Sequence, residues 1–370
     1  MKLYSGEFRK ICSDIKRINK HIIIYGAGMI GSVTTLSILN ENDLLDRVAF
    51  FIDGDSKKWG TEIEGIRVEP KSRLTEINGS DYVIIIAISR FYDLYIELEE
   101  IENFKNTECY VVPMLCIDNY PIHRESIIKK QGDKQIIPKV INYMWLGRHA
   151  LPSHLQKCID SWKRLCPDYE IRRFNENNYD IEKIPYMKQA YEAKAFGFVP
   201  DYARLDILYN YGGIYLDTDV ELVKPLDELL YQEAFCCVEK WQTVNFGGGS
   251  GSVQGNRLIG ELLKEREDIC FIEKDGSQNR NTCGYYDTKF FMEKGYQMSG
   301  RVQNIEGLTI YPYEVFHPYD YMSGKTNMTR NTYGIHHFNG GWLDKKQTEA
   351  NRLSRNNYER VSELAKRANC

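Results

Sequence analysis

The sequence lacks a pair of cysteines at the spacing of a metal site or a thiol–disulfide site. Its ten cysteines are scattered along the chain, and none belongs to a Cys-x-x-Cys motif. This spacing argues against a structural zinc site and against thioredoxin-like redox chemistry. The N-terminal residues also lack the apolar segment of a secretion signal. We therefore expect reduced thiols, buried in the core of a cytoplasmic protein.

Long apolar runs and an excess of charge of one sign are missing as well. The longest apolar segments, such as residues 82–88, are far too short to span a bilayer. The formal net charge of −4 creates no field that would attract nucleic acid. These absences disfavour a membrane-spanning protein and a nucleic-acid partner. They leave open a peripheral contact with the inner face of the cell membrane.

The chain has enough hydrophobic residues for two cores. Its 370 residues are 42% hydrophobic and 12% aromatic, and a typical domain has about 150 residues. A polar and basic stretch without clear periodicity separates two regions of regular pattern, and we take it as a linker. The expected division is a first domain over residues 1–118, a linker over 119–135 and a second domain over 136–370.

The first domain shows the strand–loop–helix pattern of a Rossmann-type unit. An apolar run over residues 21–25 leads into the motif Gly26-x-Gly28-x-x-Gly31. Such glycines let backbone N–H groups approach an anion at a helix N-terminus, and Asp53 ends the next strand, where these folds bind ribose hydroxyls. Four expected strands are about half of a complete dinucleotide fold, so NAD chemistry is not expected. The loop is either a nucleotide or nucleotide-sugar site, or a feature kept only for packing.

The second domain is organised around residues 198–221. Pro200 and Asp201 suit the first turn of a helix, and the following apolar residues recur at helical spacing. Gly212 and Gly213 end this helix, because glycine accepts the left-handed conformation found there. A short apolar strand then leads directly to an Asp-Thr-Asp sequence.

The two acids of this sequence, Asp217 and Asp219, form a candidate metal site. In a strand, residues i and i+2 point to the same face, so the two carboxylates would aim at one spot. Two like charges held together disfavour ionisation unless a cation lies between them. Mg²⁺ or Mn²⁺ fits, and Mg²⁺ typically shares its oxygen ligands with substrate phosphates. A bare Asp-x-Asp can also be two solvated acids, but the helix, the glycine turn and the strand make this one far more specific.

This arrangement resembles the sugar-binding region with a DXD motif of glycosyltransferase family 32-like enzymes. These include bacterial capsular polysaccharide glycosyltransferases and, more distantly, the large clostridial glucosylating toxins. The resemblance extends from about residue 137 to 342 and is carried by Asp201-Tyr-Ala-Arg204, residues 211–216 and Asp217-Thr-Asp219. It implies an α/β fold with a GT-A-like transferase domain. Residues 51–68 resemble the small Rossmann-like domain that precedes some sugar acyltransferases and capsule-assembly enzymes.

The resemblance also implies a reaction and a set of site residues. A sugar would move from a nucleotide diphosphate donor, most often UDP-linked in the family, to a hydroxyl of a surface or capsular glycan or a lipid-linked oligosaccharide, with retention of configuration. Asp219 would hold the metal with Asp217 alongside, Asp201 would bind donor hydroxyls, and Arg204 would face the phosphates. The alternative for Asp201 and Arg204, one helical turn apart, is a surface ion pair.

Further site residues are expected at the two ends of the domain. Trp145, at the end of the strand that opens the domain, is the candidate for stacking on the nucleotide base, with a plain core residue as the alternative. In the closing segment, His337 is a candidate metal ligand or else a core or capping histidine. Asn339 and Trp342 are candidate donor contacts.

Two other features leave alternatives open. The glycine-rich loop at residues 245–251 either brings backbone close to a substrate or is a flexible surface loop. The chain could also be a binding or regulatory protein that senses a nucleotide-sugar with an inactive transferase domain, or a toxin-like enzyme that glycosylates a protein. The intact acids disfavour the inactive form, and the missing secretion and translocation segments disfavour the toxin.

Overall fold

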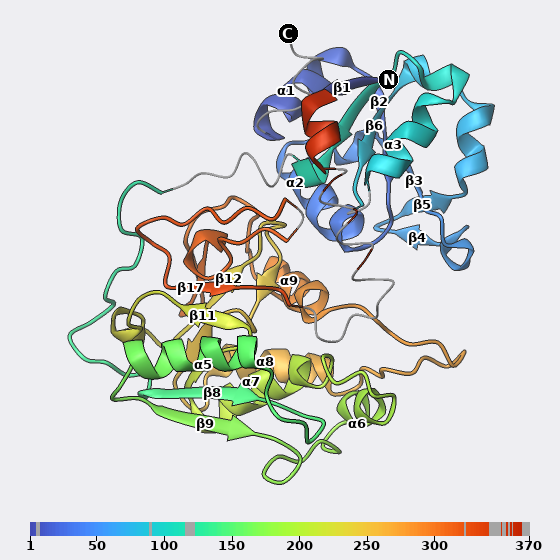
Figure 1. Cartoon of the computed structure of the whole chain (residues 1–370). Coiled ribbons are helices and arrows are strands. Elements are labelled where there is room, and N and C mark those ends of the chain that lie inside the picture. Colours follow the sequence, from blue (N-terminus) through green and yellow to red (C-terminus); the bar gives the residue numbers. More distant parts are fainter. Residues whose placement is uncertain are drawn as a thin grey trace. The chain divides into compact units, whose positions relative to one another are not determined.

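The computed structural model describes residues 1–4, 8–88, 91–114, 123–321, 323–339, 349, 353, 356 and 358–364, with only the backbone for 8–11. Its contacts divide the chain into two compact units (Figure 1). The first contains residues 1–120, 322–324 and 346–370, and the second contains 121–321 and 325–345. Within the described residues, no helix combines the length and the apolar character needed to cross a bilayer.

The first unit is built on a seven-stranded sheet in the order β1-β7-β6-β2-β3-β5-β4. All neighbouring strands in it are parallel except β4 and β5. The strands are β1 (Lys2–Tyr4), β2 (His21–Tyr25), β3 (Val48–Ile52), β4 (Glu62–Ile63), β5 (Ile66–Glu69), β6 (Tyr82–Ile86) and β7 (Glu108–Val111). The four strands predicted from the apolar runs are therefore present, and β2 and β6 are almost fully buried. The Rossmann-type assignment itself stays a prediction.

The described helices of this unit are short. They are α1 (Phe8–Ile18), the π-helix η1 (Ile30–Thr35), α2 (Leu36–Glu41), α3 (Phe91–Glu99) and the 3-10 turns η2 (Leu45–Arg47), η3 (Ser56–Lys58), η4 (Lys71–Glu76), η5 (Gly79–Asp81) and η6 (Glu102–Phe104). Near the C-terminus, the ring of Tyr358 packs edge-on against Phe91 at 6.4 Å, and Arg360 lies over the ring of Tyr92. The described part of the tail therefore packs on the first unit, whereas its sequence position suggested the second. Tyr358 and Val361 of this segment are buried, and Tyr358 contacts Phe91 at the start of α3.

The second unit contains an eight-stranded mixed sheet in the order β15-β16-β12-β14-β10-β8-β9, with β13 beside β12, and a separate β11–β17 pair. The strands are β8 (Val140–Met144), β9 (Glu170–Phe174), β10 (Gly213–Tyr215), β11 (Val220–Leu222), β12 (Ala234–Val238), β13 (Val244–Asn245), β14 (Ser250–Ser252), β15 (Gln303–Ile305), β16 (Leu308–Tyr311) and β17 (Gly334–His336). Strands β8, β9 and β10 are parallel, while β14 runs antiparallel to β10 and β12. The carboxyl ends of β8, β9, β10 and β12 thus lie at one edge.

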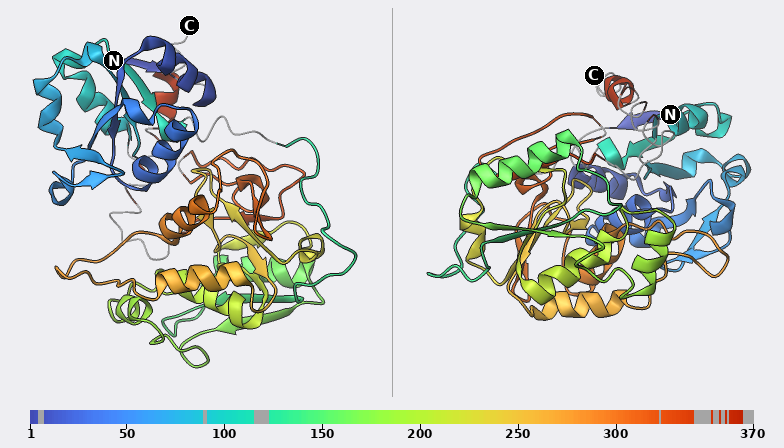
Figure 2. Two further views of the ribbon diagram at one scale, coloured as in Figure 1. Left: turned by 180° about the vertical axis from the view of Figure 1, so that it is seen from behind. Right: turned by 60° about the horizontal axis from the view of Figure 1, so that its bottom comes forward.

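Helices cover both faces of this sheet, which confirms the predicted α/β class (Figure 2). The helical elements are α5 (Ser153–Leu165), α6 (Pro185–Glu192), α7 (Pro200–Tyr211), α8 (Arg257–Arg266), α9 (Cys283–Glu293), η7 (Asp227–Leu230) and η8 (Tyr313–Val315). Trp162 on α5 is fully buried and packs in one core with Ile141 and Ile214 of the sheet. The described cysteines are unpaired and, apart from half-buried Cys270, buried, as expected for reduced core thiols.

The expected linker is not a free connector over its described part. The N–H of Ile127 donates to Asn331 Oδ1 at 3.1 Å, and the N–H of Gln131 donates to the Tyr231 carbonyl at 3.2 Å. Ile128 is buried in the core of the second unit. The isoleucines within this basic stretch anchor it, so the segment from residue 123 onward belongs to the second unit.

Candidate active site

The helix, glycine turn and strand predicted from the sequence are present as α7, Gly212–Gly213 and β10. Pro200 begins the helix, and Gly212 and Gly213 have φ angles of 65° and 90°, a region that favours glycine. A Cβ atom on Gly213 would lie 2.8 Å from the carbonyl oxygen of Val140 on the neighbouring strand. The turn therefore needs glycine for both its conformation and its close approach to β8. Strand β10, which follows this turn, leads to Asp217 at the carboxyl edge of the sheet.

Asp217, Asp219 and His336 form a group with metal-ligand spacing. One ligand atom from each lies within 4.8 Å of the others. The acids lie in a turn between β10 and β11, closed by a hydrogen bond from the Val220 N–H to the Asp217 carbonyl at 3.1 Å. They converge as predicted, although through a turn and not along a strand.

The histidine of this group is His336, not the expected His337. Strand β17 pairs with β11 so that His336 lies opposite Val220, next to the acids. Its Nε2 is 3.3 Å from Asp219 Oδ1. His337 directly follows the strand; its N–H donates to the Asp219 carbonyl at 3.0 Å, and its ring Nε2 lies 3.0 Å from Glu221 Oε2.

The charges of this group are coupled. Burial tends to raise the pKa of Asp219, but the His336 ring and the Asn339 N–H, which donates to Oδ2 at 2.9 Å, hold it at about 2. Burial tends to lower the pKa of His336, and the adjacent Asp219 carboxylate outweighs it, so the net shift is upward. The predicted donor residue Asn339 thus touches the metal group through its backbone. Trp342 lies outside the described residues.

Asp201 and Arg204 lie directly behind Asp217. Arg204 Nη1 is 3.3 Å from Asp201 Oδ1, and its Nη2 is 3.3 Å from Asp217 Oδ2. The side chains of Asp201 and Arg204 are only 8% and 6% exposed, which rules out the surface ion pair. Burial raises the pKa of Asp201 against the pull of the arginine. Arg204 Nη1 also lies 3.1 Å from Cys283 Sγ, a contact that the sequence did not suggest.

The glycine-rich loop at residues 245–251 is buried against these residues, so the alternative of a flexible surface loop is wrong. The N–H of Asp217 donates to the Gly247 carbonyl at 2.8 Å. A Cβ on Gly247 would lie 2.2 Å from Asp217 Oδ2 and 3.0 Å from Arg204 Cζ. The missing side chain therefore lets the loop backbone press against the acid–arginine pair.

Sequence reasoning missed Glu239 and His317. Glu239 directly follows β12, and its carboxylate accepts a hydrogen bond from Asn245 Nδ2 at 2.6 Å. Burial raises its pKa, while Asn245 and the positive charges of the site oppose the shift. Buried His317 lies 5.3 Å from His336, ring to ring, beside a narrow cleft that Glu239 also lines. The position of Glu239 directly after the apolar run of residues 234–238 was a usable signal, whereas no local pattern marked His317.

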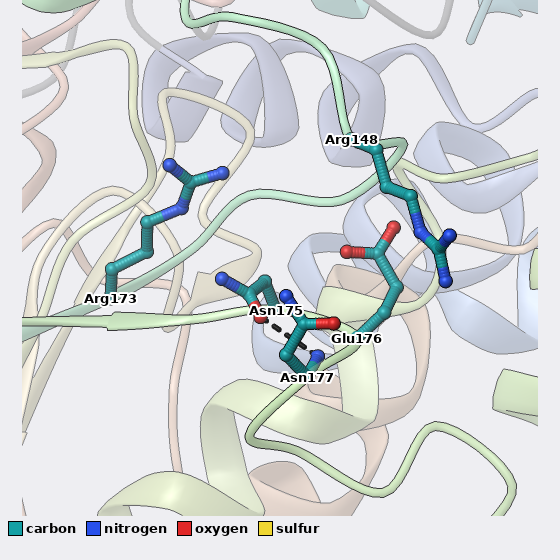
Figure 3. A pocket seen from close by; sticks show the side chains of 5 residues that line it. All are labelled: Arg148, Arg173, Asn175, Glu176 and Asn177. Atoms are coloured by element: carbon teal, nitrogen blue, oxygen red, sulfur yellow. Dashed lines mark hydrogen bonds between the residues drawn. The ribbon is translucent and has the colours of Figure 1, made fainter.

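A larger hollow of about 400 Å³ opens at the ends of β8 and β9 (Figure 3). It is lined by Arg148, Arg173, Asn175, Glu176 and Asn177. Trp145 lies at the end of β8 on the same edge, is half-buried, and donates from Nε1 to the His149 carbonyl at 2.9 Å. The alternative of a plain core residue does not describe this tryptophan. Its stacking on a base stays a prediction.

Backbone conformation and close packing explain two of the three glycines in the loop of the first unit. Gly26 has a φ of 116°, and a Cβ on Gly31 would lie 1.8 Å from the Gly26 carbonyl oxygen, whereas a Cβ on Gly28 would meet nothing within 4 Å. Asp53 accepts hydrogen bonds from the Ala27 N–H at 2.8 Å and from Lys58 Nζ at 3.1 Å. Its carboxylate thus holds the loop itself, which supports the packing alternative.

Comparison with known proteins identifies a family region in the second unit. Residues 152–236 match the family model described as the glycosyltransferase sugar-binding region containing the DXD motif. The match includes Asp201, Arg204, Asp217 and Asp219. The predicted glycosyltransferase class is therefore confirmed for this region.

Curated relatives and solved structures are similar to parts of the chain. Inositol phosphoceramide mannosyltransferase 1 of Schizosaccharomyces pombe is 27% identical over 166 residues, which are 41% of this chain and 47% of that protein. Uncharacterized glycosyltransferase L373 of Acanthamoeba polyphaga mimivirus is 28% identical over 170 residues, 43% of this chain and 64% of that protein. The chain thus spans about half to two thirds of their lengths. Among solved structures, the PaToxG glycosyltransferase has a TM-score of 0.34 at 16% identity, covering 42% of this chain and 69% of that one. The galactosyltransferase LgtC has a TM-score of 0.31 at 13% identity, covering 59% of this chain and 94% of that one.

Proposed function

We propose that the second unit transfers a sugar from a nucleotide diphosphate donor, with UDP as its nucleotide, to a hydroxyl group of a surface or capsular glycan or a lipid-linked oligosaccharide. The observation that carries this proposal is the group of Asp217, Asp219 and His336 at the carboxyl edge of the sheet. The two acids lie within the matched residues 152–236, and His336 joins them through the pairing of β17 with β11. Open α/β sheets bind their ligands at this edge. Transfer with retention, in the cytoplasm or at the inner face of the membrane, is part of the proposal.

The residues present fit a divalent cation. Two carboxylates and one imidazole lie within reach of one ion, and His336 Nδ1 is buried without a hydrogen-bond partner among the described residues. The two carboxylates supply the oxygen ligands that suit Mg²⁺ and Mn²⁺, and an imidazole is a common ligand of divalent metals. When bound, such a cation neutralises the charge that develops on a diphosphate leaving group.

The chain's own residues orient the two acids of this group. Arg204, with its side chain only 6% exposed, touches Asp217 and Asp201, so in this structure it holds Asp217 in place from behind. The Gly247 carbonyl fixes the Asp217 backbone. The Asn339 N–H and His336 both hold the carboxylate of Asp219. The acids are therefore rigidly oriented toward the edge where the donor phosphates would lie.

The proposal is tested by screening nucleotide-sugars for hydrolysis and transfer with Mn²⁺, with Mg²⁺ and with excess chelator. We expect turnover that needs the cation and that Asp219→Asn abolishes without unfolding the protein. Asp160→Asn, an exposed acid on α5, is the matched control and should leave turnover unchanged. Full activity of Asp219→Asn, or of the wild type in chelator, contradicts the metal-dependent function. Nucleotide-sugar binding without any turnover would instead identify a sensor with an inactive domain.

A further inference from the structure

A cysteine lies among the charged residues behind the proposed metal group. Cys283 is the first residue of α9, and its side chain is buried. Arg204 Nη1 lies 3.1 Å from its Sγ. Burial raises the pKa of Asp201, and a hydrogen bond from the Cys283 thiol is among the contacts that oppose this rise. Cys283 therefore contacts both members of the buried acid–arginine pair, whereas buried Cys237 lies in the apolar core of the same unit.

The thiol of Cys283 carries its proton at neutral pH. Burial and the nearby Asp201 carboxylate raise its pKa well above the ordinary value, and the positive charge of Arg204 opposes them only in part. A thiol has one S–H donor and a sulfur that accepts weakly. The protonated group can therefore donate to Asp201 and accept from Arg204 at the same time. Because the thiolate and not the thiol is the nucleophile, this cysteine is suited to hydrogen bonding and not to covalent chemistry.

These contacts set which nitrogen of Arg204 faces the metal group. Its Nη1 lies 3.3 Å from Asp201 Oδ1 and 3.1 Å from Cys283 Sγ. Its Nη2 lies 3.3 Å from Asp217 Oδ2 and 3.4 Å from Asp217 Oδ1. Asp201 and Cys283 thus hold one end of the guanidinium, and the other end faces the carboxylate of Asp217. Because the guanidinium is a planar and rigid fork, fixing one end also fixes the other.

The position of Cys283 is itself fixed by a second arginine. Its carbonyl accepts a hydrogen bond from Arg266 Nη2 at 3.1 Å. Arg266 Nη1 donates to the carbonyl of Asp201 at 3.3 Å, so this arginine ties the first turn of α9 to the first turn of α7. The thiol therefore approaches Arg204 from a backbone that is held in place.

We propose that Cys283 is a positioning residue of the transferase: its thiol holds Arg204 at Nη1, so that Nη2 orients Asp217 toward the cation. The inference rests on the proposed function and deepens it, because it assigns the orientation of a metal-binding acid to a residue of α9, far from the Asp-x-Asp in sequence. A side chain that both donates and accepts hydrogen bonds should replace the thiol. An apolar side chain should not, even where it fills the same space.

Substitutions at Cys283 separate hydrogen bonding from packing. Cys283→Ser keeps a donor and an acceptor, Cys283→Val fills the space without hydrogen bonding, and Cys283→Ala removes both. Cys237→Ser and Cys237→Ala are the matched controls, because Cys237 is buried among apolar side chains of the same unit. A hydroxyl buried there without a partner costs stability. Serine should therefore be tolerated better than alanine at Cys283 and worse than alanine at Cys237.

The measurement is calorimetric titration of the metal-free full chain with Mn²⁺, with urea unfolding in chelator run on the same variants. Cys283→Ala and Cys283→Val should bind Mn²⁺ at least roughly tenfold more weakly than wild type, the scale of outer-shell changes at metal sites. Cys283→Ser should recover most of this affinity, and both Cys237 variants should bind Mn²⁺ like wild type. Wild-type affinity in Cys283→Val, or equal losses in Cys283→Ser and Cys283→Val, overturns the inference and leaves the proposed function standing. If the wild type binds no Mn²⁺, the proposed metal-dependent function fails and the inference fails with it.

Discussion

The adjacent histidines provide the sharpest test of the metal group, because the structure assigns them opposite roles. His336 is buried next to Asp219, with side chains 8% and 14% exposed, while His337 and Glu221 are 33% and 44% exposed. His336→Gln should therefore weaken Mn²⁺ binding by at least about tenfold, since even outer-shell changes cost about 10- to 100-fold in metal affinity. His337→Gln should leave Mn²⁺ affinity and turnover close to wild type.

The stability of the metal-free proteins should show the same contrast. Removing His336 takes away the imidazole next to the Asp219 carboxylate and leaves the hydrogen bond from the Asn339 N–H. Losing one partner of a buried polar contact costs about 1–3 kcal/mol. For a unit of this size, about 2 kcal/mol lowers Tm by about 4–8 °C. An exposed pair such as His337–Glu221 contributes about 0–1 kcal/mol.

The assays are Mn²⁺ titration by calorimetry and thermal unfolding in chelator, run side by side on both variants. A loss of Mn²⁺ affinity in His337→Gln with wild-type affinity in His336→Gln would refute the register-based assignment. Equal small effects in both would show that the two aspartates bind the ion without a histidine.

Two further substitutions test the donor side and the loop. Trp145→Ala should weaken nucleotide binding by about 1–3 kcal/mol, the scale of base–aromatic stacking, whereas exposed Trp59→Ala in the first unit should not; unchanged UDP affinity by calorimetry would exclude stacking. Gly247→Ala should abolish turnover because its Cβ would lie 2.2 Å from Asp217 Oδ2, whereas Gly54→Ala has nothing within 4 Å and should be silent. Normal kcat in Gly247→Ala would show that the loop can move without disturbing the acids.

The local part of the site could be predicted because its signals are contiguous in sequence. Pro200, the Gly212–Gly213 pair and the short strand after it each act within a few residues. Because helix, glycine turn and strand follow one another directly, the sequence also places the Asp-x-Asp motif after that strand. All four features are found at the predicted positions.

The remaining features depend on pairings far apart in the chain. Whether His336 or His337 faces the acids is set by the register of β17 on β11, and a shift of one residue would exchange them. The burial of the glycine-rich loop depends on its packing against Asp217 and Arg204. The docking of Tyr358 on Phe91 likewise joins distant segments. Spacing within one segment carries no information about such contacts.

The buried ion pair of Arg266 and Asp287 joins α8 to α9 beneath the site, and its removal is the last prediction. Arg266 on α8 donates to the carboxylate of Asp287 on α9 and to the carbonyls of Asp201 and Cys283 at 3.3 Å and 3.1 Å. The side chains of Arg266 and Asp287 are 5% and 1% exposed. Burial raises the pKa of Asp287 to about 6, against the attraction of Arg266.

The sign of the pH effect follows from this shift. Because the folded pKa of Asp287 lies above its unfolded value, the folded state binds the proton more tightly, and this contribution to stability is lost as pH rises from about 4 to about 6.

Without Arg266, an isolated buried carboxylate protonates instead of remaining charged. Arg266→Gln should therefore be mildly destabilised at pH 5 and lose about 3–5 kcal/mol at pH 7.5, the cost of breaking one side of a buried pair. The double variant Arg266→Gln with Asp287→Asn should recover much of that loss at pH 7.5. Urea unfolding of the wild type, both single variants and the double variant at the two pH values measures this cycle. A loss in Arg266→Gln that is the same at pH 5 and pH 7.5, or single losses that simply add in the double variant, would show that Asp287 carries no charge that Arg266 neutralises.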